Sequence, residues 1–138
     1  MNRMRILRTL LVVAAGLAAS KCGGIIDPST NQVETPSGTV QVGGTSAHPF
    51  SVGKNGEISV KFTVLSPVSN TYLGLIWAAA GGDGGCASIG GQYQNNQFAQ
   101  LGIPGISGQI SSGKYCIVVY DPGTLSQPEN YTLAISHP

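Results

Sequence analysis

Histidine, cysteine and serine are the residue types of this 138-residue sequence whose side chains could do acid–base or covalent chemistry. The two histidines, His48 and His137, each stand directly before a proline. Two imidazoles could form an acid–base pair or ligate a metal, but neither lies in an HExxH-like motif. We therefore expect both histidines at the surface or at strand ends, and we expect no metal site.

No serine has the surroundings of a catalytic nucleophile. The sequence Ile106-Ser107-Gly108 lacks the first glycine of a Gly-x-Ser-x-Gly elbow. The acidic residues are scattered singly, so they form no evident carboxylate pair. The sequence therefore predicts no catalytic residue, no cofactor and no enzymatic activity.

Two cysteines are placed to form a disulfide. Cys86 and Cys116 are thirty residues apart and belong to no CxxC motif or zinc-type cluster. Cys86 follows a glycine-rich segment and Cys116 lies in a strongly apolar run, so the two side chains can reach each other. Because exported proteins oxidise their cysteines, we expect a Cys86–Cys116 disulfide.

The glycine-rich segment at residues 81–85 has the composition of a phosphate or calcium loop but lacks the required partners. A P-loop needs Gly-Lys-Ser/Thr before a helix, and that motif is absent. A calcium loop needs several acids at alternating positions, and Asp83 is the single acid here. We expect a flexible hairpin loop.

Tyr93 is the aromatic residue best placed to be exposed and to bind a ligand. It lies in the polar segment 90–97, whose amide side chains both donate and accept hydrogen bonds without carrying charge. An exposed ring can stack on the flat face of a sugar. We assign a candidate site for an extracellular polysaccharide or envelope component to Tyr93, Gln92, Gln94 and Asn95; the alternative is a solvated loop without a ligand.

The charge balance argues against a nucleic-acid partner. Charged residues make up only 9% of the chain, and the formal net charge is +1. Three arginines lie within the first eight residues, and the chain after residue 20 has four lysines, six acids and a net charge of −2. A nucleic-acid surface needs clustered lysine and arginine, which the sequence lacks beyond its first eight residues.

Residues 1–20 have the pattern of a bacterial export signal. Basic residues precede an apolar run of about eleven residues, and small residues follow it. The run is too short to span the ~30 Å hydrocarbon core of a bilayer. Ala18-Ala19-Ser20 predicts cleavage before Lys21, which makes the protein extracellular or part of the cell envelope.

A lipoprotein signal is the alternative for this segment. Cys22 would then be the lipid-bearing first residue, and the protein would contact the membrane only through that anchor. Cys22-Gly23-Gly24 fits such a signal, whereas Lys21 and Ala19 do not. Residues 21–38 are expected to be a flexible tether, because the stretch from residue 27 is polar, contains two prolines and lacks periodicity.

The rest of the chain has the two-residue periodicity of β-strands. Glycine and proline interrupt it every 8–15 residues, and no segment after residue 20 shows helical periodicity. Residues 47–64 predict a hairpin with its turn at 54–57, and the apolar run at 115–120 predicts a central strand. Trp77, Tyr115 and Tyr131 share strand faces with apolar residues and are expected in the core. The further expected strands are 39–43, 72–78, 97–101, 106–110 and 131–136.

These features predict an all-β fold for residues 39–138. Seven to eight short strands with frequent turns favour an antiparallel β-sandwich, jelly-roll-like in arrangement. About 100 residues are enough to build one hydrophobic core.

Several segments resemble the bacterial pre-peptidase C-terminal (PPC) domain, a β-sandwich of secreted proteins. They are Phe50-Ser51-Val52, Gly56 with the strand to Val64, the segment GKYCIVVYD at 113–121, and Asn130-Tyr131-Thr132-Leu133. Such domains usually accompany a protease or another exported enzyme, whereas we expect the domain of this sequence to stand alone. Some members bind calcium, so the resemblance implies an alternative in which Asp83 or Asp121 joins a site assembled from distant loops.

The cysteine pair and the closing His137-Pro138 are similar to a group of small secreted or lipid-anchored bacterial proteins of unknown function. The sequence therefore predicts a non-enzymatic, exported β-sandwich of the cell envelope or medium. The alternative is a carbohydrate- or polymer-binding module that uses Tyr93 and the neighbouring amides.

Overall fold

The computed structural model describes residues 28–138. The expected export signal, the candidate lipidation residue Cys22 and residues 21–27 of the expected tether lie outside these described residues. Residues 28–138 contain no helix with the length and apolar character needed to cross a bilayer.

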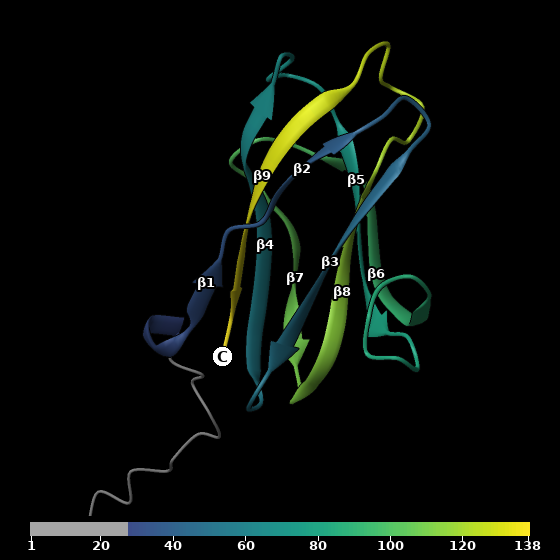
Figure 1. Cartoon of the computed structure of the whole chain (residues 1–138). Coiled ribbons are helices and arrows are strands. Elements are labelled where there is room, and N and C mark those ends of the chain that lie inside the picture. The colour runs from purple at the N-terminus through teal and green to yellow at the C-terminus, as the bar shows by residue number, and fades with distance from the viewer. Residues whose placement is uncertain (1–27) are drawn as a thin grey trace, which may run out of the picture.

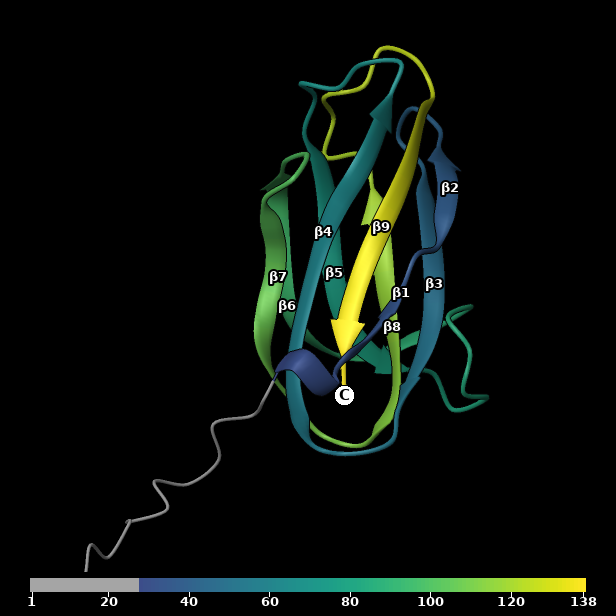
Figure 2. The same ribbon diagram turned by 90° about the vertical axis from the view of Figure 1, so that its left-hand side faces the viewer.

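The described chain forms two antiparallel β-sheets packed face to face (Figure 1). This confirms the antiparallel sandwich, with nine strands rather than seven or eight. A single 3-10 turn, η1 (Pro28–Thr30), precedes the strands. Sheet A, which faces the viewer in Figure 2, contains β1 (Gln32–Glu34), β2 (Ser37–Val40), β9 (Glu129–His137), β4 (Gly56–Ser66) and β7 (Pro104–Ile110). Sheet B has the order β3 (Thr45–Val52), β8 (Gly113–Tyr120), β5 (Leu73–Ala80) and β6 (Ile89–Ala99).

The core lies between the two sheets and follows the alternation of the sequence. In β4, Ile58, Val60 and Phe62 are buried, whereas Glu57 and Lys61 are exposed. Trp77, Tyr115 and Tyr131 are buried, as the shared strand faces predicted. Burial of apolar side chains, at roughly 25 cal/mol per Å² removed from water, is the main force that holds the sheets together.

The apolar run predicted to be central is the inner strand β8, which pairs with both β3 and β5. Its inner face is buried, and its outer face is partly covered. Ile117 and Val119 point into the core, and on the opposite face Cys116 is buried beneath the loop between β5 and β6, whereas Val118 is half-buried. Partial cover on the outer face favours apolar residues at consecutive positions, which explains the sequence of this strand.

The predicted hairpin at residues 47–64 is wrong, although both of its strands exist. β3 belongs to sheet B and β4 to sheet A, so the turn between them crosses from one sheet to the other. Asn55 accepts a hydrogen bond at Oδ1 from the Ser112 amide, which ties this turn to the one that leads into β8. Alternation identifies a strand but does not identify its partner.

The predicted tether is wrong for residues 32–38, which include strand β1 and the start of β2. Val33 pairs with Ser136, and Thr39 pairs with Asn130, both on β9. The Ser37 and Thr132 hydroxyl oxygens are 2.8 Å apart, and the Thr39 hydroxyl donates to Asn130 Oδ1 at 2.6 Å. These short edge strands are held by polar contacts, so they lack the apolar alternation that marks the inner strands.

The predicted loop at 90–97 and the strand predicted at 97–101 form one continuous strand, β6. β6 is the edge strand of sheet B, and nearly all of its residues are at least partly exposed. Glycine, asparagine and glutamine are weak strand formers, and pairing with β5 overrides that preference here. The candidate ligand-binding residues therefore lie on a strand rather than on a loop.

Candidate functional site

Tyr93 lies on a cluster of aromatic rings at one end of the sandwich. Its ring centroid is 4.9 Å from that of Trp77 and 5.9 Å from that of Tyr115. The Tyr93 side chain is 58% exposed, whereas Trp77 and Tyr115 are each 7% exposed. Phe50 extends the cluster inward, at 5.7 Å from Tyr115. Tyr93 thus presents an aromatic surface that is supported from below by buried rings.

A β-bulge in β6 places Tyr93 in this position. Trp77 pairs with Gln94 and Ala78 pairs with Gln92, so Tyr93 is an extra residue without a partner on β5. Bulges turn a side chain away from simple alternation and are frequent at sheet edges. The bulge explains how Tyr93 packs on the inward-facing Trp77.

The amides of Gln94 and Asn96 close the gap between the two sheets. Gln94 Oε1 accepts a hydrogen bond from the Ser107 amide at 3.1 Å, and Asn96 Nδ2 donates to the Gly105 carbonyl at 3.0 Å. Both partners belong to β7, the edge strand of sheet A that lies beside β6 (Figure 2). These side chains replace the backbone ladder that β6 and β7 lack.

The structure therefore separates the four candidate ligand-binding residues. Gln94 faces β7, whereas Asn95 pairs with Ile76 of β5 and its Oδ1 accepts a hydrogen bond from the Tyr120 hydroxyl at 2.7 Å. Gln92 is exposed. Tyr93 packs on Trp77 and Gln94 is bonded to β7, whereas Asn95 is bonded to Tyr120 of β8 in its own sheet.

A shallow hollow of about 460 Å³ runs along β6, lined by residues 94–98 and Gly105. At its far end Phe98 is 65% exposed and packs edge-to-face on Tyr72, with centroids 6.1 Å apart. An amide strip thus lies between exposed aromatic rings at Tyr93 and Phe98. The sequence analysis did not assign Asn96 or Phe98 to the site, and only their placement on one strand with Tyr93 would have indicated them.

Strands β6 and β7 themselves carry no charge, and the nearest exposed charges beside β7 are Glu57 and Lys61 of β4. Residues 84–113 contain no aspartate, glutamate, lysine, arginine or histidine. The side chains available for recognition there are aromatic, amide, hydroxyl and aliphatic groups. Such a surface suits an uncharged partner, because a charged one would lose hydration without gaining a countercharge.

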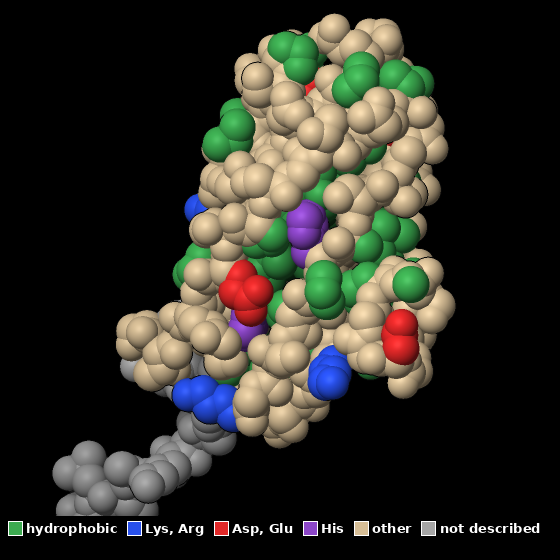
Figure 3. Space-filling model, viewed as in Figure 1, with side chains coloured by type: hydrophobic (Ala, Val, Ile, Leu, Met, Phe, Trp, Pro, Cys, Tyr) green, Lys and Arg blue, Asp and Glu red, His purple; other side chains and the backbone are tan. Residues whose placement is uncertain are grey.

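The two histidines lie on the opposite edge of the sandwich, and His137 is at a strand end as expected, because it is the last residue of β9, but it is not at the surface. His137 is fully buried, and its Nε2 is 2.9 Å from Glu34 Oε1. Its ring also packs on Phe50, at 5.2 Å between centroids. Figure 3 shows histidine side chains along this edge, with an acidic side chain beside one of them. The pair joins β9 to β1 and serves the fold.

His48 lies within β3 and is half-buried rather than at a strand end. Its Nε2 is 2.6 Å from the Tyr131 hydroxyl, which donates to Ser46 Oγ at 2.7 Å. Burial lowers the pKa of His48 below its ordinary value of 6.5. The backbone of Gly38 packs directly against these hydrogen-bonded side chains. A Cβ at Gly38 would lie 2.6 Å from the Tyr131 hydroxyl oxygen.

The acidic residues considered for calcium bind backbone amides. Asp121 accepts hydrogen bonds from the amides of Gly43, Gly123, Thr124 and Leu125. Burial acts to raise the pKa of Asp121, but these four donors outweigh it and hold the pKa below the ordinary value. In the described part of the chain, no three His, Cys, Asp or Glu side chains gather into a group that could hold a metal ion.

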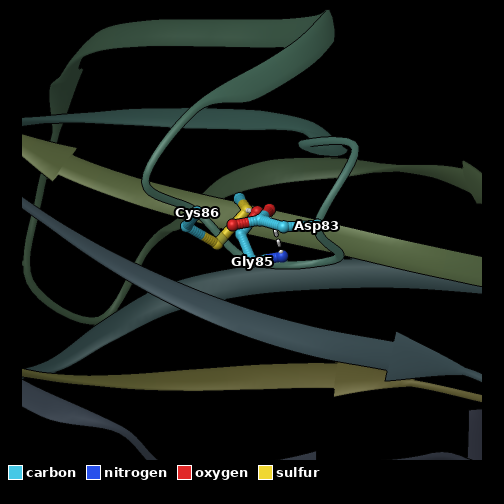
Figure 4. The surroundings of a disulfide bond; sticks show 4 residues. Asp83, Gly85 and Cys86 are labelled. Carbon is cyan, nitrogen blue, oxygen red and sulfur yellow. Dashed lines mark hydrogen bonds between the residues drawn. A yellow bond between two sulfur atoms is a disulfide. The ribbon is translucent and has the colours of Figure 1, made fainter.

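The predicted Cys86–Cys116 disulfide is confirmed, with the two Cα atoms 5.8 Å apart. It pins the glycine-rich loop between β5 and β6 against the outer face of sheet B (Figure 4). Asp83 Oδ1 accepts a hydrogen bond from the Gly85 amide at 2.9 Å inside this loop. The loop leads into Ile89, the first residue of β6, which is four residues before Tyr93.

Comparisons with known proteins show no family for this chain. No family model and no curated protein matches the chain. Among solved structures, the chain is similar to a periplasmic inhibitor of g-type lysozyme from Aeromonas hydrophila. The match has a TM-score of 0.45 and 17% identity, and it covers 78% of this chain and 89% of that one. A likeness of this size carries no argument about function, and the PPC resemblance stays a prediction.

Proposed function

We propose that the protein is a non-enzymatic, exported β-sandwich of the cell envelope or medium that binds an uncharged polymer along β6. The observation that carries the proposal is the Tyr93 ring, which is 58% exposed and supported by the buried rings of Trp77 and Tyr115. A ring fixed in this way loses little conformational entropy when a flat sugar face stacks on it.

The neighbouring groups support an uncharged, extended ligand. Amide residues fill the strand between Tyr93 and Phe98 over about 17 Å at ~3.4 Å per residue, with Gln94 and Asn96 bonded to β7 and Asn95 bonded to Tyr120. Residues 84–113 carry no charge, so recognition must rest on stacking and on neutral hydrogen bonds. A linear oligosaccharide offers both kinds of contact.

Export is supported by two independent features. The sequence begins with the pattern of a signal peptide, and the structure contains a disulfide of the kind that persists in oxidising compartments. Whether the mature chain starts at Lys21 or at a lipidated Cys22 decides between release and anchoring. The intact mass of the mature protein from membranes and from medium separates the two.

Binding is tested with Tyr93→Leu, which keeps apolar cover over Trp77 but removes the aromatic face. The probes are cellohexaose, maltohexaose and N-acetylglucosamine hexamer, measured by isothermal titration calorimetry. We expect at least one probe to bind the wild type. We expect Tyr93→Leu to weaken that binding roughly fivefold, equal to about 1 kcal/mol of aromatic stacking.

Val42→Ala is the matched control, because Val42 is also an exposed large apolar residue but lies outside β6 and β7. It should bind as the wild type does, and the recovered oligosaccharide should be unchanged in mass. Absence of binding by the wild type to all three probes contradicts the proposal, as does equal binding by Tyr93→Leu.

A further inference from the structure

We infer that the hollow along β6 prefers polymers whose units carry carbonyl oxygens, such as acetylated sugars, over polymers that carry only hydroxyl groups. This inference rests on the proposed function and narrows its ligand class from uncharged polymers to acetylated ones. It starts from which atoms of the β6 amide side chains are already hydrogen-bonded.

Gln94 has its oxygen bonded and its nitrogen free. Its Oε1 accepts a hydrogen bond from the Ser107 amide at 3.1 Å. A backbone amide can only donate, so this contact fixes which end of the Gln94 side chain is the oxygen. No hydrogen bond of Gln94 Nε2 is found among residues 28–138, which leaves both of its N–H groups for a ligand.

Asn96 and Asn95 repeat this arrangement. Asn96 Oδ1 accepts from the Phe98 amide at 2.9 Å, and Asn96 Nδ2 gives one of its two hydrogens to the Gly105 carbonyl at 3.0 Å. Asn95 Oδ1 accepts from the Tyr120 hydroxyl at 2.7 Å, and its Nδ2 has no partner in the described part of the chain. The oxygens of this strip are thus bonded within the protein, whereas each nitrogen has at least one N–H group left over.

The free N–H groups belong to residues that line an open space. Gln94, Asn95 and Asn96 all line the hollow of about 460 Å³. Each of them is at least partly exposed, so no ring or loop has to move before a ligand can reach them. Gln94 and Asn96 are two residues apart on a strand, or about 7 Å at ~3.4 Å per residue, so one chain lying along β6 can contact both.

A carbonyl oxygen matches these free donors better than a hydroxyl group does. An amide N–H that gives up its water to a ligand needs an acceptor there, or its desolvation is not compensated. A carbonyl supplies the acceptor alone, whereas a hydroxyl also brings an O–H that must stay bonded to water, because the oxygens of Gln94, Asn95 and Asn96 are engaged. Gln97 is the exception in the hollow, since no hydrogen bond fixes its amide within residues 28–138.

An anionic polymer is the other class of ligand that is rich in acceptors. Residues 84–113 offer a carboxylate no countercharge. The exposed charges beside β7 are Glu57 and Lys61, one of each sign, so together they give an anion no net attraction. Taking a carboxylate out of water costs far more than taking out an acetyl group, so the neutral strip favours the acetyl carbonyl.

The test compares partially O-acetylated xylohexaose with the same sample after mild alkaline deacetylation, so the two probes share their backbone and length and both are uncharged. Each probe is titrated into the ¹⁵N-labelled wild type, with hexagalacturonate as the anionic probe. We expect the acetylated form to bind about fivefold more tightly than the deacetylated form, and hexagalacturonate to bind more weakly than the acetylated form. The acetylated form should also move the side-chain NH₂ cross-peaks of Gln94 and Asn95 further downfield.

Gln94→Glu keeps the oxygen that accepts from Ser107 and replaces the free NH₂ group with a second oxygen. We expect it to abolish the preference for the acetylated form. Asn95→Asp makes the same change beside Tyr120 and should reduce the preference, which gives a second variant should Gln94→Glu fail to fold. Gln41→Glu is the matched control, because Gln41 is exposed in the turn between β2 and β3 and should leave the fivefold preference intact.

The outcomes separate this inference from the function beneath it. Equal affinity for the two forms, tighter binding of hexagalacturonate, or an unchanged preference in both Gln94→Glu and Asn95→Asp overturns the inference, and the polymer-binding proposal stands. Failure of the wild type to bind the acetylated form also overturns the inference. If the wild type in addition binds none of cellohexaose, maltohexaose and N-acetylglucosamine hexamer, the polymer-binding proposal is overturned with it.

Discussion

The imidazole of His48 is a side chain whose protonation between pH 5 and 8 should change the stability of this fold. It lies half-buried in β3 against the Tyr131 hydroxyl, and burial lowers its pKa below 6.5. A lowered pKa means that the folded state favours the neutral ring more than the unfolded state does. His48 therefore contributes stability above pH 6.5, and that contribution is lost as the pH falls toward the folded-state pKa.

We expect His48→Gln to reveal this dependence, because glutamine does not titrate. Urea unfolding of the wild type and the variant at pH 8, 7, 6 and 5 gives the difference in their free energies of unfolding. That difference should be constant above about pH 7.5 and should shift in favour of the variant below pH 6.5. A difference that shifts in favour of the wild type as the pH falls would contradict the account.

At the residue scale, alternation located the buried aromatic residues but not the polar contacts. Trp77, Tyr115 and Tyr131 were predicted in the core, and they are buried. The position of His137 could not be predicted, since its partner Glu34 lies 103 residues away and meets it only through the register of β1 on β9. Such side-chain contacts depend on which distant strands pair with each other. A single sequence does not show that pairing.

At the element scale, the inner strands and the edge strands β3 and β7 were predictable from the sequence, whereas β1 and most of β6 were not. The apolar run of β8 and the alternation of β4 and β9 are confirmed as strands of the two sheets. The edge strands β1, β2 and β6 have largely polar sequences, because water covers one side of them. For the same reason, the candidate site was predicted by composition but was placed on a loop, and Asn96 and Phe98 were not assigned to it.

The loop between β5 and β6 owes its position to the disulfide. Cross-linking residues thirty positions apart restricts the unfolded chain, which contributes about 3–4 kcal/mol in the loop-entropy model. We expect the double variant Cys86→Ala, Cys116→Ala to lose a free energy of unfolding of that order in urea denaturation. The double variant should be insensitive to reductant, and wild type treated with reductant should unfold at the same urea concentration as the variant. A wild type equally stable with and without reductant would contradict this role.

At the scale of the whole molecule, the two open edges of the sandwich have different chemistry. One edge joins β1 and β2 to β3 and contains His48, His137 and Glu34, whose contacts hold the fold together. The other joins β6 to β7 through neutral amides and presents Tyr93 and Phe98 to solvent. Only the second edge combines exposed rings with a neutral surface, which is why we place ligand binding there.

The distribution of charged residues along the chain agrees with this difference between the two edges. Charged residues make up 9% of the sequence, and the segment from 84 to 113 has none. A protein with so little charge on its binding face gains little from electrostatic steering, so its association should depend only weakly on ionic strength. This behaviour distinguishes a neutral polymer from an acidic or basic macromolecule as the partner.

The central claim is that the ligand lies along β6 and β7, and amide chemical-shift mapping tests it most directly. The ¹⁵N–¹H spectrum of the wild type is recorded with and without saturating N-acetylglucosamine hexamer, at 50 mM and 500 mM salt. We expect the largest shifts to fall on residues 89–110 at both salt concentrations, with amides of β1, β2 and β3 unmoved. Shifts concentrated on the histidine edge, or a spectrum unchanged by the hexamer, would contradict the account.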